Sequence, residues 1–343
     1  MLDYKKTGTF LASKRKQAQM TQADVAQKLG VSFQAVSKWE NGTLPFPEIP
    51  HPVLVLKSEE PGSKQKLAME YGYSESICHD MINHLVNDIM VMGARPLAVL
   101  DTIVCGNAEK ETIKSFIKGI SDACRENGCS LVGGETSIQP QVVAKGVYVL
   151  TSSIAGIISK DKVIDGSGIT EGDTVLAVAS NGLHTNGYSL VRMLMDQMPQ
   201  IKLEKIDGET FIEQIMKPHT PYRNAIGNLL ECPGIHGMAH ITGGGIQGNL
   251  CRILPDGLYA DIDLSKIKTL PIFRYIQRIG NIDEAEMLST FNCGVGLIVV
   301  VSERYAEQAI RNIAKYHDCY EIGRIRKGSG KVLFRNSVNW ESL

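Results

Sequence analysis

The chain has 343 residues, of which 43% are hydrophobic and 21% are charged, and its formal net charge is −1. This composition indicates a folded protein of two or more domains, and it excludes a disordered chain and one whose overall charge attracts nucleic acid. The eight cysteines are scattered without the CxxC spacing of a zinc site, and no apolar run is long enough for a transmembrane helix. We therefore expect a cytoplasmic protein with reduced thiols and no membrane partner.

Residues 1–44 have the pattern of a small all-α domain. A first helix is predicted up to about Gln19, and the segments TQADVAQKLG and VSFQAVSKWENG follow it. Each segment has an N-cap residue, Thr21 or Ser32, and a closing glycine, which predicts two short helices in a helix-turn-helix. Seven Lys and Arg residues between positions 5 and 41, against two acidic residues, suit contacts with DNA phosphates. The alternative is a helical module that serves only for packing.

The rest of the chain alternates strands with amphipathic helices, which predicts an α/β (α+β) body. Four prolines in TLPFPEIPHP predict a linker over residues 45–52. A polar, turn-rich segment over residues 159–174 divides the body into a first domain, residues 53–160, and a second, residues 161–343. A final hairpin is predicted around residues 328–330.

The helix predicted from His79 onwards carries a polar stripe. Its members lie at offsets of four, seven and eight residues and therefore share one helical face: Asp80, His84, Asn87 and Asp88. Gly93 ends the helix. A buried face with carboxylates and an amide suits a divalent cation with phosphate, whereas the alternative is a solvated polar face. The residues of this stretch alone leave the two interpretations equal.

Four further segments place glycine beside polar residues. In SEEPGSK, a basic loop with Lys64 opens a helix. In SLVGGETSI a strand is expected to end in the segment 133–136, where paired glycines let backbone approach a ligand and Glu135 projects from the loop. The segments NGLHTNGYSL, with His184 and Asn186, and HITGGG offer backbone N–H groups to an anion at a helix N-terminus.

These segments together resemble the aminoimidazole ribonucleotide synthetase (PurM-like) superfamily. Residues 88–96 resemble its D-x4-G-A-x-P signature, and further resemblances follow in the same order: LVGGET, GLHTNGYSLVR, HITGGG-x3-N and EM-x3-FNCGVG. The resemblance runs from about Pro52 to Arg335. It implies two α/β domains, a homodimer whose first-domain strands pair into a barrel, and a mixed sheet in the second domain. The implied activity is that of phosphoribosylformylglycinamidine cyclo-ligase, with ATP and Mg²⁺ as cofactors and a purine intermediate as substrate.

The resemblance also implies a role for individual residues. The implied metal ligands are Glu59, Asp88 and Glu135. The implied ATP and phosphate contacts are Lys64, Asn87, Asp88, Gly243, Gly244 and Gly245. His184 and Asn186 are the implied catalytic residues.

The segment MTQADVAQKLGVSFQAVSKWENG resembles the lambda-repressor-like (XRE) helix-turn-helix family. By that resemblance residues 32–38 form the recognition helix. The implied DNA contacts are Gln22, Ser32, Gln34, Ser37 and Lys38.

A second function remains open from the sequence. The chain has Glu59 and Glu60 where the synthetases carry a T-D-G-V-G-T-K-like loop, and the helix-turn-helix replaces their glycine-rich N-terminal lid. These features favour the alternative of a DNA-binding transcriptional regulator that uses a degenerate synthetase body to sense a purine intermediate or a nucleotide.

Overall fold

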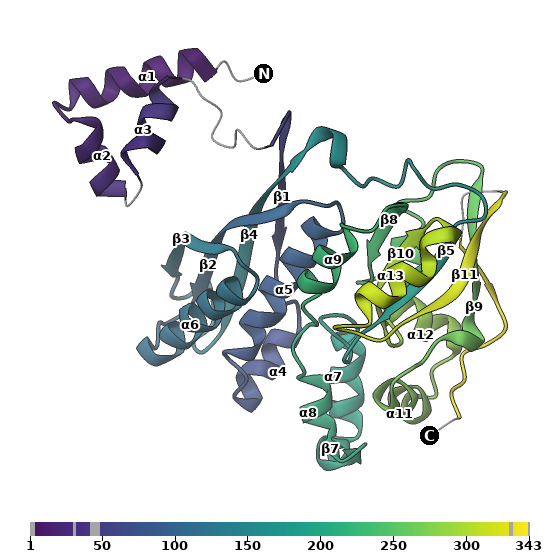
Figure 1. Cartoon of the computed structure of the whole chain (residues 1–343). Helices are drawn as coiled ribbons and strands as arrows, with labels where there is room; N and C mark the ends of the chain where they lie inside the picture. The colour runs from purple at the N-terminus through teal and green to yellow at the C-terminus, as the bar shows by residue number, and fades with distance from the viewer. Residues whose placement is uncertain (1–3, 30–31, 42–48, 329–331, 342–343) are drawn as a thin grey trace. The chain divides into compact units, whose positions relative to one another are not determined.

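The computed structural model of the chain describes residues 4–29, 32–41, 49–328 and 332–341 (Figure 1). The chain forms two compact units. One comprises residues 1–53 with 158–161, and the other comprises residues 54–157 with 162–343. No helix in the described ranges is both long and apolar enough to cross a membrane.

The first unit contains three helices: α1 (Tyr4–Gln17), α2 (Gln22–Leu29) and α3 (Phe33–Glu40). Ser32 caps α3 by accepting a hydrogen bond from the backbone N–H of Ala35, as its place before the helix predicts. Arg15 of α1 forms a two-pronged ion pair with Glu40 of α3, at 2.5 and 2.9 Å. The all-α helix-turn-helix is confirmed. Half of the expected linker, residues 45–48, lies outside the described residues, and its last residue, Pro52, begins strand β1.

The first half of the second unit is built on a four-stranded sheet in the order β1-β4-β2-β3. Its strands are β1 (Pro52–Glu59), β2 (Arg95–Cys105), β3 (Ser130–Ile138) and β4 (Tyr148–Ser159). Its helices are α4 (Lys64–Tyr71), α5 (Ser76–Met90) and α6 (Lys110–Glu126). Strand β2 pairs parallel with β3 and antiparallel with β4, and α5 and α6 lie on one side of the sheet (Figure 1).

The second half is built on a six-stranded mixed sheet in the order β12-β9-β11-β5-β10-β8. Its strands are β5 (Thr174–Ala179), β8 (Ile235–His240), β9 (Leu258–Asp263), β10 (Val295–Val301), β11 (Cys319–Lys327) and β12 (Val332–Arg335). The α-helices of this half are α7 (Tyr188–Gln197), α8 (Phe211–Ile215), α9 (Arg223–Leu229), α10 (Gly245–Leu250), α11 (Pro271–Gly280), α12 (Glu284–Thr290) and α13 (Ala306–Ile313). A small ribbon pairs β6 (Lys205–Ile206) with β7 (Glu209–Thr210). Every residue of the interior strand β10, which lies between β5 and β8, is buried, as its unbroken apolar sequence predicts.

Two sequence-based expectations about strands are wrong. Residues 133–136 do not form a loop at the end of strand β3, because residues 133–138 pair with β2 and the strand continues to Ile138. Glu135 therefore lies within a strand and not on a loop. The expected final hairpin does not form between β11 and β12, because β9 lies between them and pairs with both. Part of the turn, residues 329–331, lies outside the described residues.

Candidate active site

The polar stripe of α5 is buried against a turn of the second half, residues 217–222. Asn87 donates to the carbonyl of Thr220 at 2.9 Å and accepts from the backbone N–H of Tyr222 at 3.0 Å. Asn83 donates to the carbonyl of His219 at 2.7 Å, and Asp80 accepts from the backbone N–H of the same residue at 2.8 Å. The alternative of a solvated polar face is therefore wrong. Much of the stripe instead satisfies backbone groups that would otherwise be buried without partners.

Lys64 lies at the start of α4 and is fully buried. Its ammonium contacts Asp80 at 2.8 Å and donates to the carbonyl of Lys217 at 2.7 Å. Burial raises the pKa of Asp80 to about 6, although the Lys64 charge opposes this rise. In this structure Lys64 neutralises Asp80, so its expected contact with phosphate stays a prediction.

A second ionic cluster lies where β1 ends beside α5. Lys57 contacts Glu59 at 3.0 Å and Asp88 at 3.1 Å, and His240 at the end of β8 contacts Asp88 at 2.6 Å. Burial lowers the pKa of Lys57, but the two carboxylates outweigh this effect and leave it raised. Burial alone would raise the pKa of Asp88, yet the hydrogen bond from His240 and the nearby positive charge of Lys57 hold it well below its usual range. Two expected metal ligands, Glu59 and Asp88, thus contact the same cation, Lys57.

His84 faces the same pair of carboxylates. Its Nε2 lies 3.5 Å from Glu59 and 3.5 Å from Asp88, while its Nδ1 lies 3.3 Å from the hydroxyl of Thr185. Burial lowers the pKa of His84 to about 4, so the ring is neutral at pH 7. The contact with Thr185 also brings the loop after β5 to this cluster.

His184 lies in the loop after β5 and has a left-handed backbone conformation, with φ of 59°. Its Nε2 lies 3.0 Å from the Thr220 hydroxyl, and its buried Nδ1 has no partner among the described residues. Burial and nearby positive charges keep its pKa well below the usual range, so the imidazole is neutral. A Cβ at Gly296 would lie 2.8 Å from the His184 ring and 1.9 Å from the Tyr222 hydroxyl. Glycine at position 296 therefore leaves room for both side chains.

The HITGGG segment forms a tight turn into α10. Gly245 has φ of 59°, and a Cβ there would lie 1.8 Å from the carbonyl of Leu288, so no side chain fits. Asn249, one helical turn after Gly245, stabilises the turn by donating to the carbonyl of Gly245 at 2.8 Å. The position of a Cβ on Gly243 lies 3.3 Å from the side-chain oxygen of Asn186. The two glycine-rich loops therefore meet at Asn186.

Three buried imidazoles, those of His184, His219 and His240, have ring nitrogens within 4.8 Å of one another. The rings of His184 and His219 are stacked, with 3.9 Å between their centroids and 22° between their planes. The lone pairs in the planes of the two rings are therefore nearly parallel and do not converge on one point. His219 and His240 contact each other through their Nε2 atoms at 2.8 Å, the distance of a hydrogen bond. This trio is therefore a hydrogen-bonded and stacked cluster that links Asp88 to His184.

Comparisons with known proteins agree with this geometry. Residues 54–158 match the family described as AIR synthase related protein, N-terminal domain, and residues 170–336 match its C-terminal domain. A phosphoribosylformylglycinamidine cyclo-ligase of Bacillus cytotoxicus is 41% identical over 294 residues, which cover 84% of each chain. One of Methylobacillus flagellatus is 42% identical over 307 residues, which cover 88% of this chain and 85% of the relative.

The chain belongs to the phosphoribosylformylglycinamidine cyclo-ligase family.

Solved structures and a third family match complete the comparison. The thiamine-monophosphate kinase of Stenotrophomonas maltophilia K279a is similar with a TM-score of 0.62 at 17% identity, over 84% of this chain and 87% of that one. A hydrogenase maturation protein HypE solved in complex with ATP has a TM-score of 0.60 at 18% identity, over 82% and 81% of the chains. These likenesses show the fold, and the expected PurM-like body is confirmed. Residues 11–47 match the helix-turn-helix family.

Of the residues expected to act in a cyclo-ligase, Glu135 lies apart from the rest. It lines a hollow on β2 and β3 with Asp101 and the glycines of LVGGET. Among the described residues, the groups of three or more acids, histidines and cysteines close enough to share a metal do not include Glu135. Burial raises the pKa of Asp101 beside it. The place of Glu135 among the metal ligands stays a prediction.

The five residues expected to contact DNA differ in their surroundings. Gln34 and Lys38 are exposed on α3, as residues facing the major groove should be. The amide of Gln22, by contrast, donates to Glu40 at 2.8 Å within the helical unit. Ser32 is the N-cap described above, and Ser37 lies 3.4 Å from the side chain of Asn41. The DNA contacts stay predictions.

Sequence reasoning gave no role to Lys57, His219 or His240, and it placed His84 on the polar stripe without a role of its own. The alternation of β1 places Lys57 on the same face as Glu59, which is a signal that was available. His219 lies in the 217–222 turn and His240 begins HITGGG. Contacts between residues 21 and 152 positions apart in the chain bring them into the cluster.

Proposed function

We propose that the chain closes the imidazole ring of formylglycinamidine ribonucleotide to give aminoimidazole ribonucleotide, at the expense of ATP. The γ-phosphate would pass to the amide oxygen of the substrate, an internal nitrogen would attack the activated carbon, and phosphate would leave as the ring closes. The main support is the identity of about 40% with cyclo-ligases over more than four fifths of both chains. This reaction would take place in the cytoplasm.

The ionic cluster supports a site for the metal of a nucleotide. Lys57 lies between the oxygens of Glu59 and Asp88, which shows that this position accommodates a positive charge matched by two carboxylates. Oxygen ligands of this kind suit Mg²⁺, so we assign Glu59 and Asp88 to hold it, with Glu135 as the further expected ligand. Bound there, Mg²⁺ would offset charge on the triphosphate. Lys57, which is partly exposed, would then be released to the phosphates.

The two glycine-rich loops support the remaining contacts. Backbone N–H groups of residues 243–245 would bind phosphate, and Asn186, which touches this turn, would orient the reacting group. The neutral ring of His184 would lie by the reacting amide, where its unpartnered Nδ1 can donate to or accept from the substrate. Asn87 and Lys64 would support these contacts from beneath, because both are buried.

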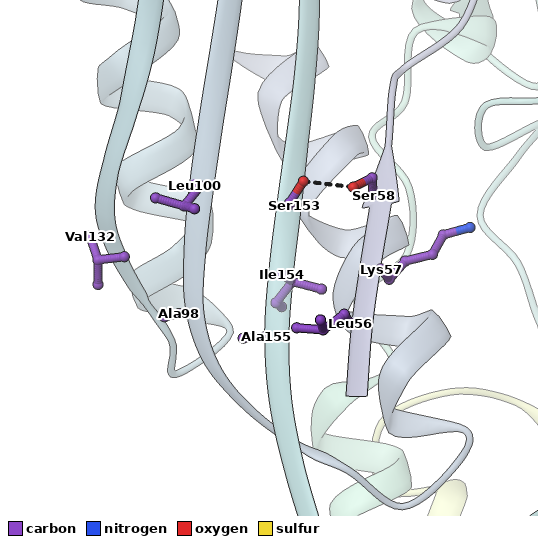
Figure 2. Close-up of a pocket in the computed structure, with 9 residues that line it drawn as sticks. All are labelled: Leu56, Lys57, Ser58, Ala98, Leu100, Val132, Ser153, Ile154 and Ala155. Atoms are coloured by element: carbon purple, nitrogen blue, oxygen red, sulfur yellow. Dashed lines mark hydrogen bonds between the residues drawn. The ribbon is translucent and has the colours of Figure 1, made fainter. Parts of the chain in front are cut away.

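A homodimer is part of this proposal. The face of the four-stranded sheet away from α5 and α6 exposes large apolar side chains: Leu56 is 73% exposed, Leu100 is 53% exposed and Val132 is 61% exposed. A hollow of about 360 Å³ on this face is lined mainly by apolar residues. Figure 2 shows Leu100, Val132 and Leu56 around it, while Lys57 points to the other side of β1. An apolar surface of this kind fits a second copy of the sheet.

The test is turnover by the purified full chain with Mg-ATP and formylglycinamidine ribonucleotide. We expect release of ADP and phosphate and formation of an aromatic amine, one for each ATP. Asp88→Asn should lower kcat by roughly 100-fold, the loss expected when one transition-state contact is removed. Asp122→Asn, on the outer side of α6, is the matched control and should keep full turnover. Absence of product from a folded, dimeric wild-type protein would contradict the proposal.

We propose DNA binding as a second function, favoured by the helix-turn-helix match over residues 11–47 and by the exposed Gln34 and Lys38. In this scheme residues 1–44 bind DNA, residues 45–52 link them to the body, and residues 53–160 and 161–343 form the two synthetase domains. Nucleotide-dependent binding to the promoter of its own gene, measured together with no turnover, would favour a regulator over an enzyme. Binding together with turnover would give a protein with both functions.

A further inference from the structure

We propose that Phe33 recognises the 5-methyl group of a thymine in the major groove of DNA and so makes the helical unit selective for sites with thymine at this contact. The inference rests on the proposed DNA binding, and it adds the residue that contacts a base and the chemical group that is contacted. Phe33 is the first residue of α3, the helix expected to enter the groove. It is not one of the five residues that the resemblance implies as DNA contacts.

Phe33 shares one face of α3 with three polar residues. Because an α-helix turns by about 100° per residue, Ser37 lies about 40° and Gln34 about 100° around the helix axis from Phe33. Lys38 follows at about 140°. Phe33, Gln34 and Lys38 are exposed and Ser37 is partly exposed, whereas Val36, outside this arc, is only 2% exposed. Phe33 therefore lies on the face that DNA would meet, and not on the packed face.

The packing of the helical unit does not explain a phenylalanine at this position. The side chain of Phe33 is 52% exposed, while the buried apolar side chains of the described helices include Ala26 and Val36. The start of α3 is already stabilised by Ser32, whose side chain accepts from the backbone N–H of Ala35. A single exposed apolar side chain is common on protein surfaces and has no meaning by itself. Here it stands among the polar residues of the face that is expected to bind DNA.

The chemistry of the major groove offers one partner for an apolar ring. The base edges there present hydrogen-bond donors and acceptors, and the methyl group of thymine is the apolar group among them. The neighbouring Gln34 carries an amide of the kind that pairs with adenine. Seven Lys and Arg residues between positions 5 and 41, against two acidic residues, complement the charge of the phosphates. DNA therefore fits both the charge of this unit and the ring of Phe33.

The experiment uses the full wild-type chain to select duplexes from a random DNA pool and then replaces the thymines of the selected site by uracil, one position at a time. Uracil lacks only the 5-methyl group. At one or more positions the replacement should weaken binding by the wild type about fourfold, which is the effect of exposing one apolar carbon. The same replacement should leave binding by Phe33→Ser unchanged. Phe33→Leu keeps an apolar side chain and should retain the response to the methyl group.

Phe10→Ser is the matched control. Phe10 is 58% exposed, as open as Phe33, but it lies on α1. This variant should respond to every uracil replacement as the wild type does. Fluorescence anisotropy measures the affinities at one fixed salt concentration, because the phosphate contacts depend on salt. Thermal melting checks that each variant is folded.

Several results would overturn the inference. Uracil replacements that act equally on the wild type and on Phe33→Ser would show that Phe33 recognises no methyl group, although DNA binding would stand. The wild type alone can also contradict the inference, if no thymine of the selected site is sensitive to the loss of its methyl group or if all duplexes bind equally. Loss of the response in Phe10→Ser as well would show that the effect is not specific to α3. Absence of DNA binding by the folded chain would overturn both this inference and the proposed DNA binding.

Discussion

The two sheets of the body differ in what covers them. In the six-stranded sheet the interior strand β10 is buried throughout, and β5 beside it is buried at five of its six positions. In the four-stranded sheet the exposure alternates along β1 and β2, and large apolar residues of one face are open to solvent. The six-stranded sheet is therefore covered within one chain. The four-stranded sheet has an uncovered apolar face, which we expect a second chain to cover.

This difference changes what a substitution should do in each place. In the six-stranded sheet a change should act within one chain, through packing and the placement of His184. On the open face of the four-stranded sheet the same type of change should act on association and should leave the fold of one chain intact. The predictions below test that separation, beginning with the largest effect.

The first prediction concerns Gly296, in β10. In Gly296→Ala the new methyl group would overlap the Tyr222 hydroxyl and the His184 ring and would break the hydrogen bond from Tyr222 to the carbonyl of Ala179. We expect the free energy of unfolding to fall by about 3 kcal/mol, the upper range for overpacking a core. Chemical denaturation measures this change.

Gly227→Ala is the control, because a Cβ on this helical glycine would meet nothing within 4 Å. It should be neutral or slightly stabilising, since alanine is the better helix former. Equal losses for the two variants would contradict the packing argument.

The second prediction concerns the open sheet. Leu100→Glu places a charge in the middle of the apolar face and should weaken self-association by roughly 100-fold, because an unpaired charge would be buried in the interface. Sedimentation measures the association, and the thermal midpoint of the separated chains should change little. Leu203→Glu, at a site that is 81% exposed outside the sheet, should leave association unchanged. A dimer that survives Leu100→Glu would show that another surface forms it.

The third prediction separates support from catalysis on α5. Asn87→Ala leaves the carbonyl of Thr220 and the N–H of Tyr222 without partners, so we expect the free energy of unfolding to fall by about 2 kcal/mol. Asn224→Ala, on the surface of α9, should cost less than about 0.5 kcal/mol. A stable Asn87→Ala protein that has lost only ATP affinity would show that Asn87 contacts the nucleotide directly.

The fourth prediction concerns the pH dependence of the histidine cluster. The pKa values of His84, His184 and His219 are lowered in the folded state. Below about pH 6.5 the unfolded chain therefore binds more protons than the folded chain, and the free energy of unfolding decreases as the pH is lowered. Asp80 opposes this below pH 6, because its pKa is raised to about 6. Each extra proton bound by the unfolded chain should lower stability by about 1.4 kcal/mol per pH unit.

Denaturation of metal-free protein between pH 7 and pH 5 measures this slope. His79→Met, a change outside the cluster, should keep the slope of the wild type. A free energy of unfolding that is constant over this range would show that the buried rings do take up protons in the folded state.

Much of the fold could be predicted because it depends on local patterns. The apolar run of β10, the cap at Ser32 and the glycines before α10 are local signals, and each element formed as expected. The hairpin was wrong because strand order depends on contacts far apart in the chain, and β9 competes for both partners. In LVGGET the pairing with β2 outweighed the weak strand propensity of glycine.

The site could be predicted only in part for the same reason. The polar stripe of α5 was recognised by its spacing, but its division between supporting the 217–222 turn and forming the ionic cluster depends on tertiary contacts. His219 and His240 each stand alone in the sequence, and only the fold makes them neighbours.

The contacts between α5 and the 217–222 turn also bear on synthesis of the chain at the ribosome. The backbone groups of the 217–222 turn that bond to Asp80, Asn83 and Asn87 are encoded more than 130 residues later, although Asp80 also contacts Lys64 and Asn83 also contacts Asn127 within the first half. Until those residues emerge, burying the polar face of α5 in the nascent first half would leave polar side chains without hydrogen-bond partners, which costs free energy. We therefore expect the nascent first half to remain loosely packed, and to depend on chaperones, until the second half has been synthesised. Cutting the chain at the boundary between the halves should yield a first half that does not fold by itself.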